Sequence, residues 1–533
     1  MAEVATPYQA LATGAEKAPG HPCILAPASA RLPWAPHGYC ISYGDALAET
    51  HRLRDAYIAA GYGRGSRVAL LMGNRPEFIL HWMALNAIGA SAVPINGDTR
   101  PDELRHQMTV SQAECVIAAP GFETLLAAGV PDGVPVAAPD APIPAAPVRR
   151  SAEGGHPDDE AALLFTSGST GKPKACILSN HYFLNVARWY TTMPGIAAMT
   201  PGQEVSLTPL PFFHMNALGC TVVGMLTIGG TIVPLDRFHP DRWWATIADS
   251  GATIVHSLGV IPAILLQRPP GPDDRRHRAR FTFGPGVDAQ HRVAFESRFN
   301  LPIVEGWAMT ETGAGAITDT AGVAYDPGRR CIGVARGDME WRIVDDAGQD
   351  VPPGQPGELW CRTRGPDPRR GFFSGYLGDP AATEAAWEGG WFHTGDIMSV
   401  DEAGRFYFVD RKKSIVRRSG ENISALEVEA ALAADPAVQA VAVTPVSDPV
   451  RDEEVFAFVV PAGDAPDAET LLARVGERLS YHKLPGWLVF TGALPVSSTN
   501  KLQRGEIRAR AEAAVANGAA LDLRKLKRKL RHG

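Results

Sequence analysis

Short apolar segments alternate with longer segments of helical periodicity from about residue 40 to about residue 300. Residues 67–72 (RVALLM) are typical of a buried strand, and residues 75–88 carry the spacing of an amphipathic helix. A second strand is predicted at residues 89–95, followed by a second helix at residues 101–111. Because successive parallel strands need a crossover helix between them, this order predicts parallel α/β layers.

The pattern changes after residue 330. Short strand-like runs at residues 341–344, 357–362 and 405–409 are separated by Gly, Pro and Asp, which favours an antiparallel subdomain. Beyond Arg411, helix and strand patterns share about 100 residues, the size of a small α+β domain. We therefore expect an α/β chain: a large multi-layer N-terminal domain, with parallel α/β sheets plus a small β subdomain, and a smaller α+β C-terminal domain.

Composition excludes several classes of protein. A chain of 533 residues suggests roughly three or four domain-sized units, and its net charge of −7 argues against nucleic-acid binding. The seven cysteines contain no C-x-x-C pair, which fits a reducing compartment better than a disulfide framework or a zinc site. Residues 1–21 lack the pattern of a secretory signal, and glycines interrupt the longest apolar stretch, residues 217–233. A cytoplasmic protein without a transmembrane segment is expected.

Residues 163–174 (LLFTSGSTGKPK) are an apolar strand that runs into a loop of Gly, Ser and Thr with two lysines. Glycines let the backbone approach an oxyanion, and free N–H, hydroxyl and ammonium groups neutralise phosphate charge. A flexible polar turn is the simpler alternative, but the preceding strand and the number of donors disfavour it. The G-x-x-x-x-G-K-[ST] pattern is absent, which disfavours kinase or GTPase chemistry. This segment predicts polyphosphate binding.

Residues 166–174 resemble, position for position, the phosphate signature of the adenylate-forming superfamily, which contains acyl-CoA synthetases, firefly luciferase and peptide-synthetase adenylation domains. Four more segments resemble its signatures in the same order: residues 306–312 (GWAMTET), 391–396 (WFHTGD), 410–429 and 495–504. The resemblance covers roughly residues 40–510. Within the superfamily, the chain most resembles bacterial acyl-CoA ligases of the crotonobetaine/carnitine–CoA ligase type. That family implies ATP, Mg²⁺ and coenzyme A as cofactors and co-substrates.

The resemblance implies a nucleotide site assembled from these segments. Glu311 and Thr170 would hold magnesium, which prefers oxygen ligands and bound phosphates. Trp307 would stack on adenine, Thr310 would contact the α-phosphate, and Asp396 would accept the ribose hydroxyls. The remaining residues assigned to nucleotide binding are Thr166, Ser167, Gly168, Ser169, Gly171, Lys174, Gly284, Gly286, Glu305 and Arg411.

The same resemblance assigns catalysis to Lys501, together with Thr310 and Glu311. The Lys501 ammonium would bridge the substrate carboxylate and the α-phosphate as pyrophosphate leaves. Asn500 stands where the family commonly has Gly. Lys413 would be the hinge of a mobile C-terminal domain, and Gly420 would lie on the loop that approaches the thiol. The implied domains are residues 1–412 and 413–515, followed by a basic tail at residues 516–533.

Residues 207–215 (LTPLPFFHM) resemble the segment that lines the acyl pocket in relatives, so Phe212, Phe213 and His214 are candidates for that pocket. Simple core packing is an equally weighted alternative for the aromatic residues. A histidine among apolar residues is likewise often structural. The acid itself is left open, with a mild preference for a short or medium chain.

An AMP-forming acyl-CoA synthetase is the leading hypothesis, acting on a small-molecule carboxylic acid. A stand-alone adenylating enzyme that passes the acyl group to a carrier protein or a non-thiol nucleophile is the second, and an ATP-binding pseudoenzyme or regulator is the third. The sequence leaves open whether the protein forms a homodimer.

The basic end, residues 524–532 (RKLKRKLRH), is suited to contact CoA phosphates, an acidic carrier or an anionic membrane. A solvated, partly mobile terminus is the favoured interpretation of it.

Overall fold

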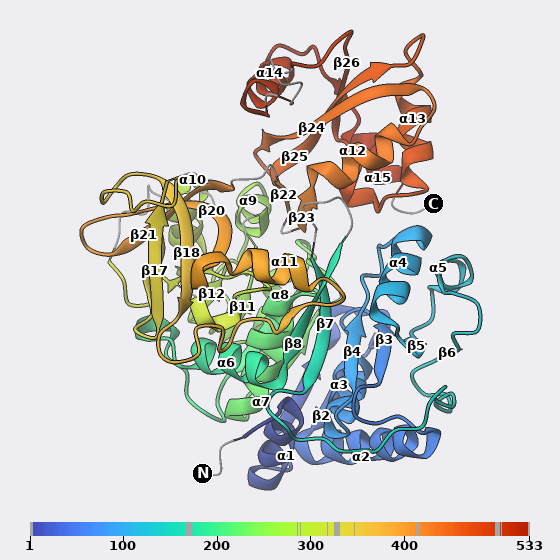
Figure 1. Ribbon diagram of the computed structural model, residues 1–533. Helices are drawn as coiled ribbons and strands as arrows, with labels where there is room; N and C mark the ends of the chain where they lie inside the picture. The colour runs from blue at the N-terminus through green and yellow to red at the C-terminus, as the bar shows by residue number, and fades with distance from the viewer. Residues whose placement is uncertain are drawn as a thin grey trace.

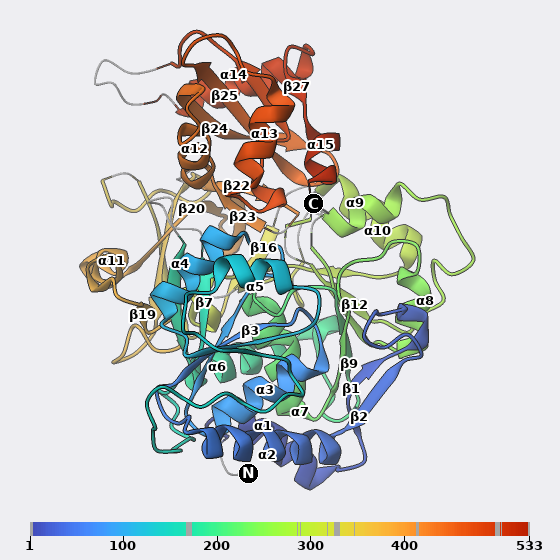
Figure 2. The same cartoon turned by 90° about the vertical axis from the view of Figure 1, so that its right-hand side faces the viewer.

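The computed structural model describes residues 4–166, 173–258, 260–284, 286–287, 289–316, 318–324, 331–345, 347–411, 415–419, 421–495, 502 and 504–530. These residues form four sheets, three in a large N-terminal domain and one in a smaller C-terminal domain that sits on one end of it (Figures 1 and 2). The predicted α/β class with two unequal domains is confirmed. In the part of the chain described, no helix is both long enough and apolar enough to cross a bilayer.

The first sheet has the order β19–β8–β7–β4–β3–β5–β6. Its strands are β3 Arg67–Leu71, β4 Ser91–Pro94, β5 Cys115–Ala118, β6 Val136–Ala137, β7 Glu160–Thr166, β8 Lys174–Ser179 and β19 Gly375–Tyr376. Its helices are α2 Tyr43–Ala60, α3 Pro76–Ala87, α4 Pro101–Ser111 and α5 Glu123–Gly129. β3 pairs in parallel with β4 and with β5, with α3 and α4 as the crossover helices, as the alternating pattern predicts. β7 and β8 form an antiparallel hairpin at the side of these parallel strands.

Helix α3 is buried on nearly all sides, so the prediction of an amphipathic helix is wrong. Its large side chains Phe78 and Trp82 lie in the main core, and the polar His81 and Asn86 are buried with them. Burial lowers the pKa of His81 to about 4. The helix is covered by α2 and by α1 (Pro7–Lys17), which leaves no face for water.

The second sheet has the order β13–β12–β11–β9–β10–β1–β2, and β9 to β13 pair in parallel. Its strands are β1 Pro22–Ala26, β2 Tyr39–Ser42, β9 Val205–Thr208, β10 Thr231–Pro234, β11 Ile254–His256, β12 Phe281–Phe283 and β13 Ile303–Val304. The accompanying helices are α6 Asn180–Thr191, the π-helix η3 Asn216–Val223, α7 Gly224–Ile228, α8 Trp243–Ser250, α9 Val260–Leu266 and α10 Ala289–Phe299. Side chains of α6, η3 and α7 share one apolar core with strands of both sheets, which makes these helices a central layer.

The third sheet is antiparallel throughout the described pairs, as predicted for the chain beyond residue 330. Its strands are β14 Gly306–Trp307, β15 Thr318–Asp319, β16 Cys331–Ala335, β17 Met339–Val344, β18 Gly357–Thr363, β20 Phe392–Val400 and β21 Arg405–Arg411. α11 (Pro380–Ala386) connects β19 of the first sheet with β20 of this one. The antiparallel pairing of β20 and β21 sets Asp396 opposite Arg411.

The C-terminal domain is built around β24 and β25, which pair over their whole length. Its strands are β22 Ile415–Arg418, β23 Glu421–Ser424, β24 Val438–Asp448, β25 Asp452–Pro461, β26 Trp487–Phe490 and β27 Leu521–Asp522. Its helices are α12 Ala425–Ala433, α13 Ala468–Gly476, the 3₁₀ helix η6 Tyr481–Lys483, α14 Arg504–Ala516 and α15 Arg524–Lys529. Two apolar cores lie on its sheet, separate from the core of the N-terminal domain. This separation is what a domain that folds around its own centre requires.

The basic end of the chain differs from the solvated terminus favoured by its sequence. Residues 524–529 form α15, which packs onto the C-terminal domain beside η6. Lys527 has no exposed surface, and Leu526 and Leu530 lie against the apolar core of that domain. The favoured interpretation is therefore wrong for this segment, because the two leucines bring one lysine of the run into the interior.

Candidate active site

The predicted phosphate loop is the connection between β7 and β8, next to the paired residues Thr166 and Lys174. Residues 167–172 fall outside the described part of the chain, and with them the predicted residues Ser167, Gly168, Ser169, Thr170 and Gly171. The two ends of the loop are described, and Thr166 of β7 lies directly opposite Lys174 of β8 in the antiparallel pairing. The hairpin therefore holds both ends of the loop at one rung of the ladder.

Glu311 lies at this rung. The Thr166 hydroxyl donates to its Oε1 at 3.5 Å, and the Tyr376 phenol donates to the same oxygen at 3.0 Å. Lys174 Nζ lies 4.8 Å from the centre of the Tyr376 ring and 3.3 Å from Asp379 Oδ2. The structure thus brings the predicted residues Thr166, Lys174 and Glu311 together around one tyrosine.

Tyr376 was not among the residues that sequence reasoning selected. It belongs to β19, which pairs with β8 and so carries the phenol across to the phosphate hairpin. Burial, followed by the charge of Glu311, raises the pKa of Tyr376 far above its ordinary value, so the phenol keeps its proton and acts as a donor. The aromatic residue in the run FFSGY was the only signal in the sequence, and such residues are common in cores.

Trp307 and Asp396, from two different strands of the third sheet, also meet. The indole Nε1 of Trp307 donates to Asp396 Oδ2 at 2.9 Å, and both side chains are buried. The backbone N–H of Asp396 donates to the Thr394 hydroxyl at 3.1 Å, which fixes the turn through Gly395. The indole N–H and the backbone turn together fix the direction of this buried carboxylate.

Three further predicted residues lie along the same side of the domain. The N–H of Glu305 donates to the Thr320 hydroxyl at 2.8 Å, and its carboxylate lies 3.7 Å from Arg292. The carbonyl of Thr310 accepts from the Tyr182 phenol at 2.8 Å. At Gly284, a Cβ atom would lie 2.5 Å from the Ser257 hydroxyl, so this position has room only for glycine.

The other predicted glycine of this turn, Gly286, has φ of +80°, a left-handed conformation that favours glycine. Arg411 ends β21, opposite Asp396, and its side chain is outside the described part of the structure, as are Lys413, Gly420 and Lys501.

The three acyl-pocket candidates divide into two groups. Phe212 is buried in the main core, with its ring 5.4 Å from that of Phe78. Phe213 and His214 are only partly buried, with ring centres 4.6 Å apart. Of the three candidates, Phe212 therefore lies in the core, and His214 contacts the C-terminal domain.

His214 meets Glu421, the first residue of β23. Its Nε2 lies 3.6 Å from Glu421 Oε2, and this contact joins the two domains. Burial alone would raise the pKa of Glu421, but the neighbouring His214, His482 and Lys483 lower it to about 2, so this carboxylate is ionised at neutral pH. Glu421 directly follows Gly420, the residue predicted to approach the thiol.

A second group of charges crosses the domain junction at α4. Glu103 lies 2.7 Å from Lys483 Nζ and accepts from the Ser480 hydroxyl at 2.6 Å. Lys483 also lies 2.7 Å from Glu427 of its own domain. Burial would raise the pKa of Glu103, but Lys483 and the hydrogen bonds hold it at about 2. Arg100 adds hydrogen bonds to the carbonyls of Leu479, at 2.9 Å, and Leu530, at 3.1 Å.

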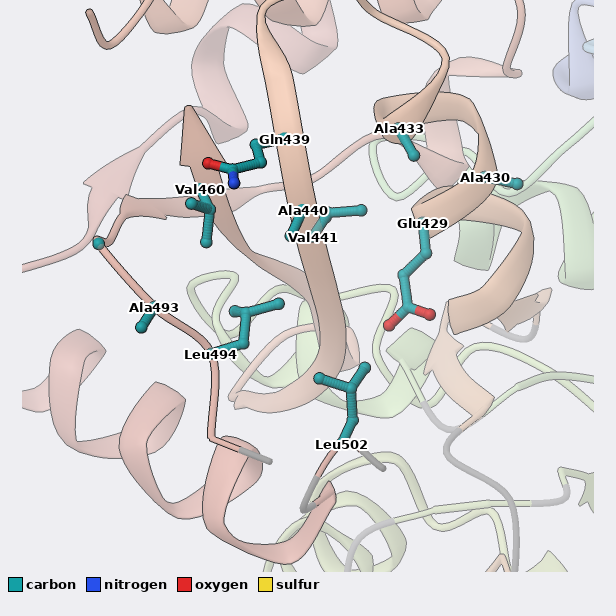
Figure 3. A pocket seen from close by; sticks show the side chains of 11 residues that line it. Glu429, Ala430, Ala433, Gln439, Ala440, Val441, Val460, Ala493, Leu494 and Leu502 are labelled. Carbon is teal, nitrogen blue, oxygen red and sulfur yellow. The ribbon is translucent and has the colours of Figure 1, made fainter. Parts of the chain in front are cut away.

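The C-terminal domain also carries an open groove of about 610 Å³ between α12, β24, residues 492–494 and Leu502 (Figure 3). Its walls are mainly apolar, with Val441, Leu494 and Leu502 facing it and Glu429 at one side (Figure 3). Glu429 accepts the N–H of Val443 at 2.7 Å. Leu502 directly follows Lys501, which is outside the described residues, and none of the predicted site residues that the structure describes lines this groove.

Two family models match most of the chain. A model of the AMP-binding enzyme family matches residues 11–377, and one of the AMP-binding enzyme C-terminal domain matches residues 427–501. A crotonobetaine/carnitine–CoA ligase of Proteus mirabilis (strain HI4320) is 30% identical over 491 residues, which cover 86% of this chain and 92% of that protein.

Two solved structures extend the comparison. The amide bond synthetase McbA from Marinactinospora thermotolerans has a TM-score of 0.80 and 25% identity, covering 95% of this chain and 99% of that one. A malonyl-CoA ligase bound to methylmalonyl-CoA and AMP has a TM-score of 0.73 and 26% identity, covering 89% and 96%. The chain therefore belongs to the AMP-binding enzyme family, the adenylate-forming enzymes that the order of its sequence motifs predicted.

Proposed function

We propose that this protein is an AMP-forming acyl-CoA synthetase. A carboxylate attacks the α-phosphorus of ATP to give an acyl adenylate and pyrophosphate, and the thiol of coenzyme A then displaces AMP. The observation that carries the proposal is the contact between His214 and Glu421, because it brings the residue after Gly420 against the predicted acyl segment. The ligase names of the curated relatives support the same acceptor.

Adenylation is assigned to the residues around the phosphate hairpin. Glu311 fits a magnesium ion because its carboxylate already faces the Thr166 hydroxyl at the mouth of the loop, and magnesium prefers such oxygen ligands. When bound, with Thr170 as a second ligand, magnesium supplies charge neutralisation to the phosphate oxygens. Lys174 and Thr310 would bind phosphate oxygens, and Lys501 would counter the charge of the departing pyrophosphate.

The nucleoside is assigned to the third sheet. Asp396 would accept the ribose hydroxyls with Arg411 beside it, and Trp307 would lie against adenine while its N–H keeps Asp396 in place. Gly284, Gly286 and Glu305 would complete the adenine side. This division gives the phosphates and the nucleoside separate elements of one rigid domain, which favours fixed positioning.

Transfer is assigned to the domain junction. Rotation about Lys413 would exchange Lys501 for the hairpin of Gly420, so that one site serves two reactions. Phe213 and His214 would border the acyl group on the side facing Glu421, whereas Phe212 supports that segment from the core.

A second acceptor class follows from the likeness to an amide bond synthetase at a TM-score of 0.80. In this alternative the same adenylate passes to an amine, or to the pantetheine thiol of a carrier protein, in place of coenzyme A. Both functions share the first reaction and differ only in the nucleophile.

A screen of pyrophosphate release over a panel of carboxylic acids, with and without coenzyme A, tests the proposal. We expect acid-dependent pyrophosphate release, and a thioester product when coenzyme A is present. Pyrophosphate release without consumption of coenzyme A would favour the second acceptor class, which amines and a carrier protein in the same assay would then identify. No release with any acid would contradict both functions and favour an ATP-binding protein without turnover.

A further inference from the structure

Helix α15 carries one lysine that faces inward. Lys527 has 0% of its surface exposed, whereas Lys525 of the same helix is exposed. The Nζ atom of Lys527 lies 2.7 Å from Glu454 Oε1, and Glu454 of β25 is also completely buried. A fully buried ammonium costs considerable desolvation energy, so this contact has to be accurately placed to be tolerated.

Glu454 joins this lysine to β22. Arg418, the last residue of β22, donates from Nε to the Glu454 carboxylate at 2.8 Å, and Arg451 lies 3.7 Å from the same carboxylate. Gly486 lies against Glu454 so closely that a Cβ atom there would be 2.4 Å from Glu454 Cγ. The carboxylate is thus confined by the backbone on one side and by cations from two elements on the others.

Arg418 stands at the base of the turn that joins β22 to β23. It pairs with Glu421 across that turn, and Ser419 within it has φ of +52° and donates its N–H to the Arg451 carbonyl at 3.0 Å. Glu421 in turn contacts His214 of the acyl segment at 3.6 Å. The contacts therefore run from Lys527 through Glu454 and Arg418 to the hairpin that faces the acyl segment.

The end of α15 also touches the N-terminal domain. Arg100, which precedes α4, donates to the carbonyl of Leu530 at 3.1 Å. The tail thus contacts the C-terminal core and the N-terminal domain directly, and it reaches the hairpin through Glu454.

We propose that Lys527 is a positioning residue for the transfer reaction. Through Glu454 and Arg418 it fixes the turn of the β22–β23 hairpin, so that the turn meets the acyl segment in the geometry that transfer requires. This inference rests on the proposed function, and it assigns the tail to the second reaction and not to adenylation. It also distinguishes the role of Lys527 from phosphate binding, because a buried lysine is not available to a phosphate group.

The test uses Lys527→Met in the full-length protein, with Lys525→Met as the exposed control and Lys527→Arg as the conservative variant. Lys527→Met leaves Glu454 paired with Arg418, so no buried carboxylate loses its last cation. Two rates are measured: acid-dependent pyrophosphate release, and acyl transfer from preformed adenylate to the acceptor that the wild type uses. We expect about tenfold slower maximal transfer with pyrophosphate release within about twofold of wild type.

The KM for the acceptor separates positioning from phosphate binding. We expect it to stay within about twofold in Lys527→Met, since misplacement of the hairpin slows the reaction without removing a contact to the acceptor. Lys525→Met should leave both rates unchanged, and Lys527→Arg should recover part of the transfer rate. An unchanged transfer rate in Lys527→Met, or an equal loss of both reactions together with a lower melting temperature, would overturn the inference.

Arg418→Met removes the contact between Arg418 and Glu454 and leaves the Glu454–Lys527 pair intact. It should slow transfer selectively as well, and if neither variant folds, the tail is structural and the inference is wrong. The same assays on the wild-type protein test the proposed function separately. If it forms adenylate but uses an amine in place of coenzyme A, the acyl-CoA assignment fails while the variants still test the role of Lys527.

Discussion

Two carboxylates of the candidate nucleotide region accept from neutral donors, although ion pairs such as Lys174–Asp379 also occur there. At the domain junction, two carboxylates instead contact basic residues of the other domain. Within the N-terminal domain, Asp396 is fixed by the neutral indole of Trp307, and Glu311 by the neutral phenol of Tyr376. Across the junction, Glu103 meets Lys483 and Glu421 meets His214, each pair with one residue from either domain.

This difference follows from what each region has to do. Buried carboxylates that accept from fixed neutral donors keep one direction, which suits a preorganised site. The ion pair of Glu103 with Lys483 and the contact of Glu421 with His214 join groups on separate domains that can part and be solvated individually, which suits a junction that opens and closes. We therefore expect changes in the nucleotide region to affect adenylation and changes at the junction to affect transfer.

Glu311→Gln should give the largest effect, because it removes the charge at the mouth of the phosphate hairpin while keeping the size of the side chain. We expect pyrophosphate release to fall by about 100-fold or more, with transfer from preformed adenylate retained. Glu384→Gln, an exposed carboxylate paired with Arg369, is the matched control. If adenylation and transfer fell equally, the division between the two regions would break down.

Trp307→Phe should have the next largest effect. It keeps an aromatic ring but removes the N–H that donates to Asp396 at 2.9 Å. A buried carboxylate that loses this donor reorients, so the KM for ATP should rise roughly tenfold, with a smaller change in the maximal rate. Trp341→Phe, a partly exposed tryptophan of the same sheet, is the control. An unchanged KM for ATP would remove Asp396 from the ribose assignment.

Glu103→Gln weakens a contact at the domain junction, and its expected effect is smaller than those of Glu311→Gln and Trp307→Phe. Lys483 keeps Glu427 as a partner, so only the attraction between the domains is lost. Transfer should slow by about fivefold, with pyrophosphate release within about twofold of wild type. Asp102→Asn changes an exposed carboxylate one position away and should change neither rate. A selective loss of adenylation would instead assign this arrangement of the domains to the first reaction.

Much of the fold could be predicted from the sequence, and so could the grouping of several candidate nucleotide-site residues, because both depend on local patterns. The strand–helix order gave parallel β3, β4 and β5, and the ordered motifs selected Thr166, Glu311, Trp307 and Asp396. The burial of α3 could not be predicted, since periodicity does not show how many layers cover a helix.

The charged contacts could not be predicted from the sequence either. Glu103 and Lys483 belong to different domains, and each alone resembles an ordinary surface residue. Lys527 stands in a run of basic residues that composition describes as solvated, and only packing of Leu526 and Leu530 turns it inward. Tyr376 comes to Glu311 through the pairing of β19 with β8, a contact between distant segments that no motif carried.

The pH dependence of the stability that the junction contributes should give the smallest effect, but its direction is the most clearly defined. The pKa of Glu103 is lowered to about 2 from an ordinary value of 4.5, so its contribution to stability is complete above pH 4.5 and is lost as pH falls towards 2. The difference in melting temperature between wild type and Glu103→Gln should therefore be constant near pH 6 and shrink below pH 4.5. Burial and the Glu103 charge raise the pKa of Glu427, and the same charge opposes the burial that lowers the pKa of His482 to about 4. Glu103→Gln therefore shifts both titrations, and part of the change below pH 4.5 belongs to these two groups. A difference that stays constant from pH 6 to pH 3 would mean that charge at Glu103 does not hold the domains together, and the contrast between the two regions would then rest on the Glu421–His214 pair alone.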